Sequence, residues 1–253
     1  MNPSLTALLC VLGAALLSML AFAVVGGGRD TDAERKGSQF AGGVGNFLVH
    51  WFMWVIGPAE RAFLALGATP DAFNFAGLGF GALAGVLIAL GRLEAGGWAI
   101  ALGGVCDILD GRIARVRGVA SAYGKFIDST LDRFVEVFAF LGFAVYLRST
   151  PFGAVIAAAA ICGSLLVSYA RARGETVGVP GPGGLMQRAE RLVLTCLACW
   201  ADAALCAPLG WPAGTLVLWT LALIATTSFV TAAHRTISIA QSLRSAARRD
   251  ADR

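Results

Sequence analysis

The sequence predicts an all-α membrane protein, in which six core transmembrane helices follow an interfacial amphipathic helix and one extra N-terminal transmembrane helix. Hydrophobic residues make up 57% of the 253 residues and charged residues only 14%, and the mean hydropathy is +0.71. Long apolar runs recur between short polar segments, which is typical of polytopic membrane proteins. No run of basic residues indicates binding to nucleic acid.

The first 45 residues are predicted to form the extra transmembrane helix and a polar loop. Leu5–Val25 is apolar and reaches the length of about 20 residues that a bilayer requires. Residues 1–4 contain no Lys or Arg and no small-residue cleavage site follows, so an uncleaved helix is preferred to a signal peptide. The following segment, Gly26–Gly45, is polar and mixed in charge, as expected for a loop.

Residues 46–67 are predicted to form the interfacial amphipathic helix, because the segment is rich in aromatic residues and carries Glu60 and Arg61 near its middle. A break at Gly57-Pro58 is the alternative to one continuous helix. Residues 68–245 are predicted to hold the six core spans, and residues 246–253 a polar tail. The core spans are expected at about Phe73–Leu90, Gly96–Val116, Tyr123–Leu147, Phe152–Arg171, Leu192–Leu209 and Ala213–Ala233.

Basic residues indicate the orientation of these spans, since Lys and Arg accumulate in cytoplasmic loops. If six spans alternate, three basic clusters fall on the same side of the membrane, which is predicted to be the cytoplasmic side of a bacterial-type inner membrane. The clusters are Arg112, Arg115, Arg117 and Lys125; Arg171, Arg173, Arg188 and Arg191; and Arg235, Arg244, Arg248 and Arg249.

Four aspartates stand out in the joined second and third core spans. Asp107 and Asp110 are spaced i, i+3 on one helix, and Asp128 and Asp132 are spaced i, i+4 on the next, so each pair shares a helix face. Two helices joined by a short turn pack antiparallel, which brings the two acidic faces together. Clustered carboxylates near a membrane need neutralisation, and divalent cations that prefer oxygen ligands provide it.

This cluster therefore predicts a two-metal site for phosphoryl transfer, with two Mg²⁺ ions and Mn²⁺ as the alternative metal. A solvated loop in which the aspartates pair with neighbouring basic residues is the structural alternative. It is less favoured because glycines occupy the same faces as the carboxylates. Cys196 and Cys199 form a CxxC spacing, which we interpret as two small apolar residues of a membrane helix and not as a metal or redox pair.

The spacing of this stretch resembles the signature of the CDP-alcohol phosphatidyltransferase family at every fixed position. The signature residues are Asp107, Asp110, Gly111, Ala114, Arg115, Gly124, Asp128 and Asp132. The resemblance implies transfer of a phosphatidyl group from CDP-diacylglycerol to an alcohol with release of CMP. It also implies that all four aspartates hold the metal ions, that Asp132 is the catalytic base, and that Gly111, Arg115 and Ser121 contact the CDP moiety.

Upstream, the segment TPDAFN is similar to a TPNxxT-like segment of the family, with Asp71 and Asn74 in place of Asn and Thr. The resemblance implies that Asp71 and Asn74 contact the nucleotide of CDP-diacylglycerol. A helix start at Pro70 and Asp71 explains the same residues equally well.

The acceptor is indicated by arginines in SYARARGE and GGLMQRAERL, two segments that are similar to those of phosphatidylinositol phosphate synthases within the family. Arginine forks bind phosphate, so a phosphorylated alcohol is expected, with inositol 1-phosphate first, glycerol 3-phosphate second and serine third. Positive-inside anchoring is the alternative role for the arginines. The predicted phosphate contacts are Arg171, Arg173, Arg188 and Arg191.

A cation transporter is the alternative from a different class, because intramembrane aspartates can mark an ion path. Such a path predicts acids spread through several spans, whereas here they cluster at one end of two helices. The enzyme is the only interpretation that explains spacing, glycines and arginines together. The family resemblance further implies a homodimer that binds membrane lipid.

Overall fold

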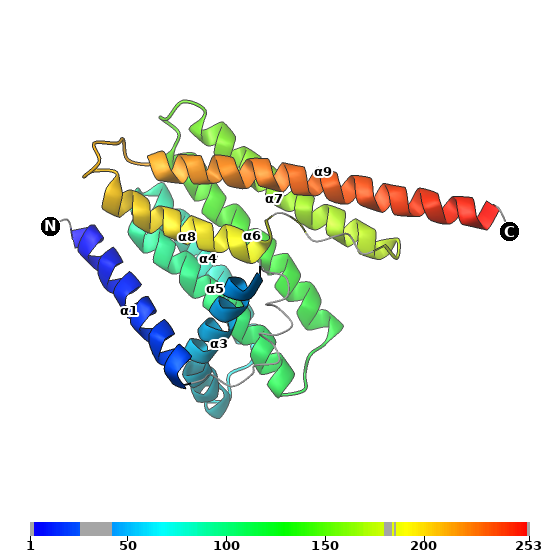
Figure 1. Cartoon of the computed structure of the whole chain (residues 1–253), viewed down its shortest axis with the longest axis horizontal. Coiled ribbons are helices and arrows are strands. Elements are labelled where there is room, and N and C mark those ends of the chain that lie inside the picture. Colours follow the sequence, from blue (N-terminus) through cyan, green and yellow to red (C-terminus); the bar gives the residue numbers. More distant parts are fainter. Residues whose placement is uncertain (1–2, 26–41, 180–183, 185, 252–253) are drawn as a thin grey trace. The chain divides into compact units, whose positions relative to one another are not determined.

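The computed structural model describes residues 3–25, 42–179, 184 and 186–251, and all regular structure in these ranges is α-helical. The helices follow one another in the predicted order (Figure 1). Their bounds are α1 Pro3–Val25, α3 Gly42–Ala65, α4 Pro70–Ala89, α5 Leu93–Val116, α6 Ala122–Tyr146, α7 Gly153–Thr176, α8 Arg188–Leu205 and α9 Thr215–Ala251.

Three details differ from the sequence prediction. α3 is continuous through Pro58, so the break considered at Gly57-Pro58 is absent, although the proline leaves the Trp54 carbonyl without its helical hydrogen bond. α8 begins four residues before the predicted Leu192, because Gln187 and Glu190 form a capping box at its start. α9 continues from the predicted end at Ala233 to Ala251, and its 37 residues span about 55 Å.

Four of the described helices are long and apolar enough to cross a membrane: Ser4–Val25, Pro70–Ala89, Gly153–Thr176 and Thr215–Arg248. α5 and α6 carry the aspartates and several basic residues, which lowers their mean hydropathy. The total number of crossings therefore stays a prediction. α9 exceeds the hydrocarbon thickness of about 30 Å, so part of it extends beyond the apolar core of a bilayer.

The chain forms two compact units, and α4, α5 and α6 contribute a part to each. The first unit comprises Met1–Ala76 and Val105–Asp128. In it, α1 packs on α3 through Phe22, whose ring meets those of Phe47 and Trp54. A largely buried ion pair joins α3 to α5, with the Arg112 Nε 2.6 Å from the Glu60 Oε2.

The second unit comprises Gly77–Gly104 and Ser129–Arg253, and contains the main hydrophobic core. α9 lies beside α7 and α8 (Figure 1). α4 and α6 touch through their backbones, because a Cβ on Gly142 would collide with the carbonyl oxygen of Gly85. Such contact requires glycine and is typical of membrane helix packing.

The buried Asp202 holds the turn between α8 and α9. Its Oδ1 accepts a hydrogen bond from the Gly214 N–H at 2.8 Å, and its Oδ2 accepts one from the Leu216 N–H at 3.0 Å. The carboxylate thus satisfies N–H groups at the start of α9 that have no partner within the helix. This anchors the far end of α8, opposite the end that carries Arg188 and Arg191.

Candidate functional site

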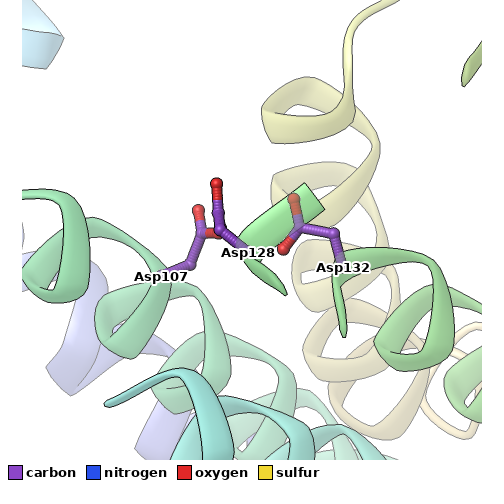
Figure 2. Close-up of side chains that lie close together, drawn as sticks. All are labelled: Asp107, Asp128 and Asp132. Carbon is purple, nitrogen blue, oxygen red and sulfur yellow. The ribbon is translucent and has the colours of Figure 1, made fainter. Parts of the chain in front are cut away.

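Three of the four predicted aspartates come together. One carboxylate oxygen from each of Asp107, Asp128 and Asp132 lies within 4.8 Å of the others. Asp107 comes from α5, and the other two are one turn apart on α6 (Figure 2). All three side chains are half-buried, so the group combines three acidic oxygens with access for a ligand.

Asp110 is placed differently from these three. It lies one turn after Asp107 on α5, is only 4% exposed, and does not belong to the group of converging oxygens. The i, i+3 spacing puts it on the same side of α5 but rotates it by about 60° from Asp107. Its predicted role as a metal ligand stays a prediction.

The converging carboxylates fit a divalent cation. Three oxygens of formal negative charge, held by two helices and partly shielded from water, are the donor set that hard cations prefer. The close approach of three like charges is unfavourable by itself and becomes favourable when a cation lies among them. Cys196 and Cys199, the two cysteines of the CxxC spacing, lie in the hydrophobic core of the second unit.

Gly111 and Arg115 lie next to each other near the C-terminal end of α5. The Arg115 Nη1 lies 3.2 Å from the point that a Cβ on Gly111 would occupy. A side chain at position 111 would therefore displace the guanidinium. Because glycine has no side chain, Arg115 can fold back along α5 over Gly111, which lies four residues earlier on the same helix face.

Ser121 and Thr69 both act as helix N-caps. The Ser121 Oγ accepts a hydrogen bond from the Gly124 N–H at 3.2 Å, at the start of α6. The Thr69 Oγ1 accepts one from the Ala72 N–H at 3.3 Å, at the start of α4, where Pro70 is the first helical residue. The helix-start interpretation of TPDAFN thus has structural support, and its Asp71 is exposed while Asn74 is buried.

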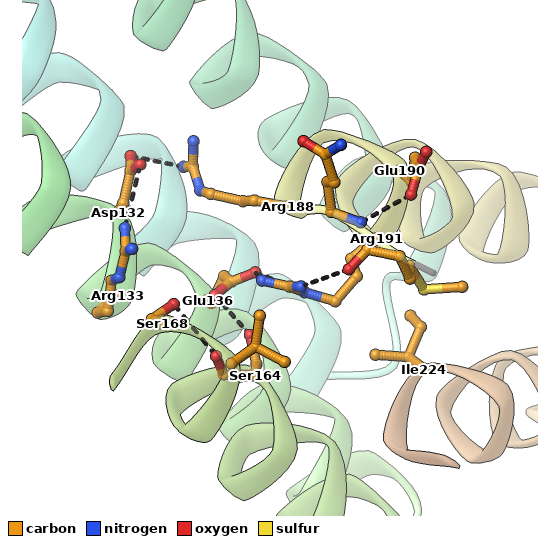
Figure 3. A network of polar contacts seen from close by, with 12 residues as sticks. Asp132, Arg133, Glu136, Ser164, Ser168, Arg188, Glu190, Arg191 and Ile224 are labelled. Carbon is orange, nitrogen blue, oxygen red and sulfur yellow. Dashed lines mark hydrogen bonds and ion pairs between the residues drawn. The ribbon is translucent and has the colours of Figure 1, made fainter. Parts of the chain in front are cut away.

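Arg188 is the predicted phosphate ligand that the structure places beside the aspartates. Its Nη2 lies 2.7 Å from the Asp132 Oδ1, and both side chains are partly exposed. The Arg133 Nη1 lies 3.5 Å from the other oxygen of Asp132. Asp132 is thereby in contact with two guanidinium groups (Figure 3). It also belongs to the acidic group.

Arg191 has a different environment, because it is 2% exposed and directed at protein groups. Its Nε and Nη2 donate to the Glu136 Oε1 at 3.0 and 2.8 Å. The other oxygen of Glu136 accepts a hydrogen bond from the Ser164 Oγ at 2.6 Å. Sequence reasoning did not single out Glu136 or Ser164, although Glu136 continues the i, i+4 series of Asp128 and Asp132 and could have been found from it.

Arg171 and Arg173 lie exposed in the last turns of α7. The Arg171 Nε donates to the Glu175 Oε1 at 3.0 Å, one turn further along. Arg235 of α9 belongs to the third basic cluster. It is buried and donates to the Val167 carbonyl at 3.0 Å.

The chain matches known proteins over the region that holds these residues. Residues 67–226, which include the acidic group and Arg188, match the family model described as CDP-alcohol phosphatidyltransferase. The chain is similar to the phosphatidylinositol phosphate synthase of Mycobacteroides abscessus, with 35% identity over 195 residues, 73% of this chain and 83% of the relative. For the synthase of Streptomyces avermitilis the identity is 36% over 197 residues, 75% and 79% of the two chains.

Solved structures show the same likeness. The crystal structure of Mycobacterium tuberculosis phosphatidylinositol phosphate synthase (PgsA1) with CDP-DAG bound has a TM-score of 0.62 and 27% identity, covering 72% of this chain and 92% of that one. The complex of the same synthase with manganese and citrate gives a TM-score of 0.62, covering 72% and 87%. The all-α membrane fold predicted from sequence is thus confirmed, while the predicted domain boundaries at residues 45, 67 and 245 stay predictions.

Proposed function

Because the chain belongs to the CDP-alcohol phosphatidyltransferase family, we propose that it makes phosphatidylinositol phosphate, by transferring the phosphatidyl group of CDP-diacylglycerol to inositol 1-phosphate with release of CMP. Family membership makes the chain an integral membrane transferase and not a cation transporter. The observation that carries the choice of a phosphorylated acceptor is the contact between Arg188 and Asp132. It sets a phosphate-binding side chain beside the carboxylate that would activate the acceptor.

On the donor side, Gly111 and Arg115 are proposed to receive the diphosphate of CDP-diacylglycerol. The guanidinium of Arg115 lies over Gly111, where no side chain blocks approach. Ser121, at the N-terminus of α6, would contribute a hydroxyl beside the exposed N–H groups of the first turn. Asp71 and Asn74 are proposed as nucleotide contacts from the first turns of α4.

Asp107, Asp128 and Asp132 are proposed to hold the metal, with Asp110 as a fourth ligand. A divalent cation bound there would neutralise the diphosphate and stabilise the departing CMP. We propose two Mg²⁺ ions, with Mn²⁺ able to replace them, in keeping with the manganese complex of the M. tuberculosis synthase.

Asp132 is proposed as the general base. Its carboxylate would take the proton of the acceptor hydroxyl as that oxygen bonds to the phosphorus of the phosphatidyl group and the bond to CMP breaks. Arg188 would hold the phosphate of the acceptor by forked hydrogen bonds, which fixes the hydroxyl near Asp132. Arg171 and Arg173 would add positive charge from α7. Arg191, the fourth predicted phosphate contact, is engaged by Glu136 and is not proposed to touch the acceptor.

The active site is proposed to face the cytoplasm of a bacterial-type inner membrane. The arginines and aspartates of the site belong to the three basic clusters or adjoin them, and such clusters mark cytoplasmic ends. A homodimer is proposed from family resemblance. Light scattering of the detergent-solubilised protein, corrected for bound detergent, would give the mass of the assembly directly.

The decisive experiment measures CMP release from CDP-diacylglycerol by purified protein with Mg²⁺, offering inositol 1-phosphate, glycerol 3-phosphate and serine separately. The proposal expects release with inositol 1-phosphate, and the lipid product identified by mass spectrometry. Release with glycerol 3-phosphate alone would instead establish phosphatidylglycerol phosphate synthesis. Release with serine alone would overturn the assignment of Arg188 to a phosphate.

A further inference from the structure

Two ion pairs connect α6 with α8 like the rungs of a ladder (Figure 3). Asp132 and Glu136 are one turn apart on α6, and their partners Arg188 and Arg191 are one turn apart on α8. We call the Asp132–Arg188 pair the outer rung and the Glu136–Arg191 pair the inner rung, and the two differ in their exposure to solvent. The side chains of Arg188 and Asp132 are 21% and 15% exposed, whereas those of Arg191 and Glu136 are 3% and 10% exposed. The outer rung can therefore meet a ligand, and the inner rung lies within protein.

In the inner rung, all three guanidinium nitrogens of Arg191 donate hydrogen bonds to protein groups. Besides the two bonds to Glu136, its Nη1 donates to the Met186 carbonyl at 3.4 Å. The Glu136 carboxylate in turn binds Ser164 of α7, so this single side chain joins α6, α7 and α8. Removing one partner of such a buried pair strongly destabilises a protein, because the remaining charge is left in a poorly solvating environment.

The inner rung also supplies a negative charge to an arginine at the start of α8. Arg188 and Arg191 both lie in the first turn, where the helix dipole is positive and cations are unfavourable. A carboxylate of α6 faces each of them and offsets this unfavourable interaction. Glu190 is occupied with the capping box, since it accepts a hydrogen bond from the Gln187 N–H at 2.7 Å. The compensation for Arg191 comes from α6, through Glu136.

We propose that Glu136 is a positioning residue for the acceptor side of the site. By binding Arg191 and Ser164 it fixes the first turn of α8, and thereby holds Arg188 beside Asp132. Arg188 then contacts the phosphate of the acceptor, and Arg191 contacts only protein. This inference rests on the proposed function, because it assigns Glu136 a part in recognising a phosphorylated acceptor.

The test is a double-mutant cycle between Glu136→Gln and Arg188→Ala, because coupling between the two positions is what the proposal requires. Glutamine keeps the size of the side chain and removes its charge. The variant is expected to raise the KM for the acceptor about tenfold, with the KM for CDP-diacylglycerol changed less than about twofold. In the Arg188→Ala background the same substitution should change the acceptor KM less than about twofold. Glu136→Asp, which restores the charge, should recover part of the loss.

Asp202→Asn is the matched control, because it alters a buried carboxylate at the opposite end of α8. It is expected to lower thermal stability while leaving the acceptor KM within about twofold, in either background. Equal effects of Glu136→Gln with and without Arg188 would overturn the proposal. So would an equal rise in the KM for both substrates.

A second measurement keeps this inference separate from the proposed function. The affinity for inorganic phosphate, titrated calorimetrically on the four proteins of the cycle, needs no turnover. Coupling between Glu136 and Arg188 in phosphate affinity supports the positioning role even if inositol 1-phosphate is not the acceptor. Independent effects in this titration overturn it, whatever the acceptor is.

Discussion

Arg112 and Glu60 form the ion pair that joins α5 to α3, with the Arg112 Nε 2.6 Å from the Glu60 Oε2. The Arg112 Nη1 also lies 3.2 Å from the Met53 sulfur. The arginine directly follows Gly111, so α3 is attached to the very turn of α5 that carries the predicted nucleotide contacts. The helix preceding the family match is in this way part of the support for the site.

Glu60→Gln is expected to destabilise the protein by about 2–3 kcal/mol, because it removes the carboxylate that faces the largely buried Arg112 guanidinium. Thermal unfolding in detergent would measure the change. Glu175→Gln is the control, because it removes a solvent-exposed ion pair between Arg171 and Glu175 within α7. It should cost less than about 0.5 kcal/mol. Similar losses for both variants would contradict a special role for the buried pair.

Asp132→Asn is expected to lower kcat for CMP release at least about 10³-fold, because the amide can neither accept the proton of the acceptor nor hold a cation as well. The thermal unfolding temperature should stay close to that of the unmodified protein, since asparagine keeps the shape of the side chain. Retention of more than a tenth of the activity would exclude Asp132 as the base.

Chelation of divalent cations should abolish CMP release, and added Mg²⁺ or Mn²⁺ should restore it. Asp107→Asn and Asp128→Asn should each raise the metal concentration needed for half-maximal activity, because each removes one of the converging oxygens. Binding of Mn²⁺, followed by electron paramagnetic resonance, gives a reading independent of activity. Unchanged Mn²⁺ affinity in both variants would contradict the assignment.

Gly142→Ala is expected to destabilise the second unit by about 1–3 kcal/mol, because its new methyl group would meet the Gly85 carbonyl where α6 crosses α4. Gly79→Ala of α4 is the control, since no atom lies within 4 Å of the added Cβ. Alanine there should be neutral or slightly stabilising, because it is the better helix former. Thermal unfolding of the two variants would compare them directly.

The helices and the acidic face could be predicted because their signals are local. Apolar runs indicate membrane helices, and the spacing of Asp128 and Asp132 places both on one face whatever α6 packs against. Helix ends were less predictable where polar residues continue a helix, as at the start of α8 and beyond Ala233 in α9. Apolar composition marks only the part of a helix that meets lipid, and not where the helix ends.

The four arginines illustrate what could not be predicted. Arg188 and Arg191 have the same charge, lie three residues apart, and were assigned one role from sequence. In the structure one contacts Asp132 and the other Glu136. The difference depends on which α6 residue faces which turn of α8, a matter of helix packing that no local pattern contains.

By itself, the sequence determined the fold class, the family and the residues that form the acidic faces, since these depend on composition and on spacings of three and four residues. Only the tertiary structure decided which charges meet. Glu136 and Arg191 are 55 residues apart in the chain, and Glu60 and Arg112 are 52 apart. Such pairs form because burial makes an unpaired charge costly, and burial exists only once the helices have packed.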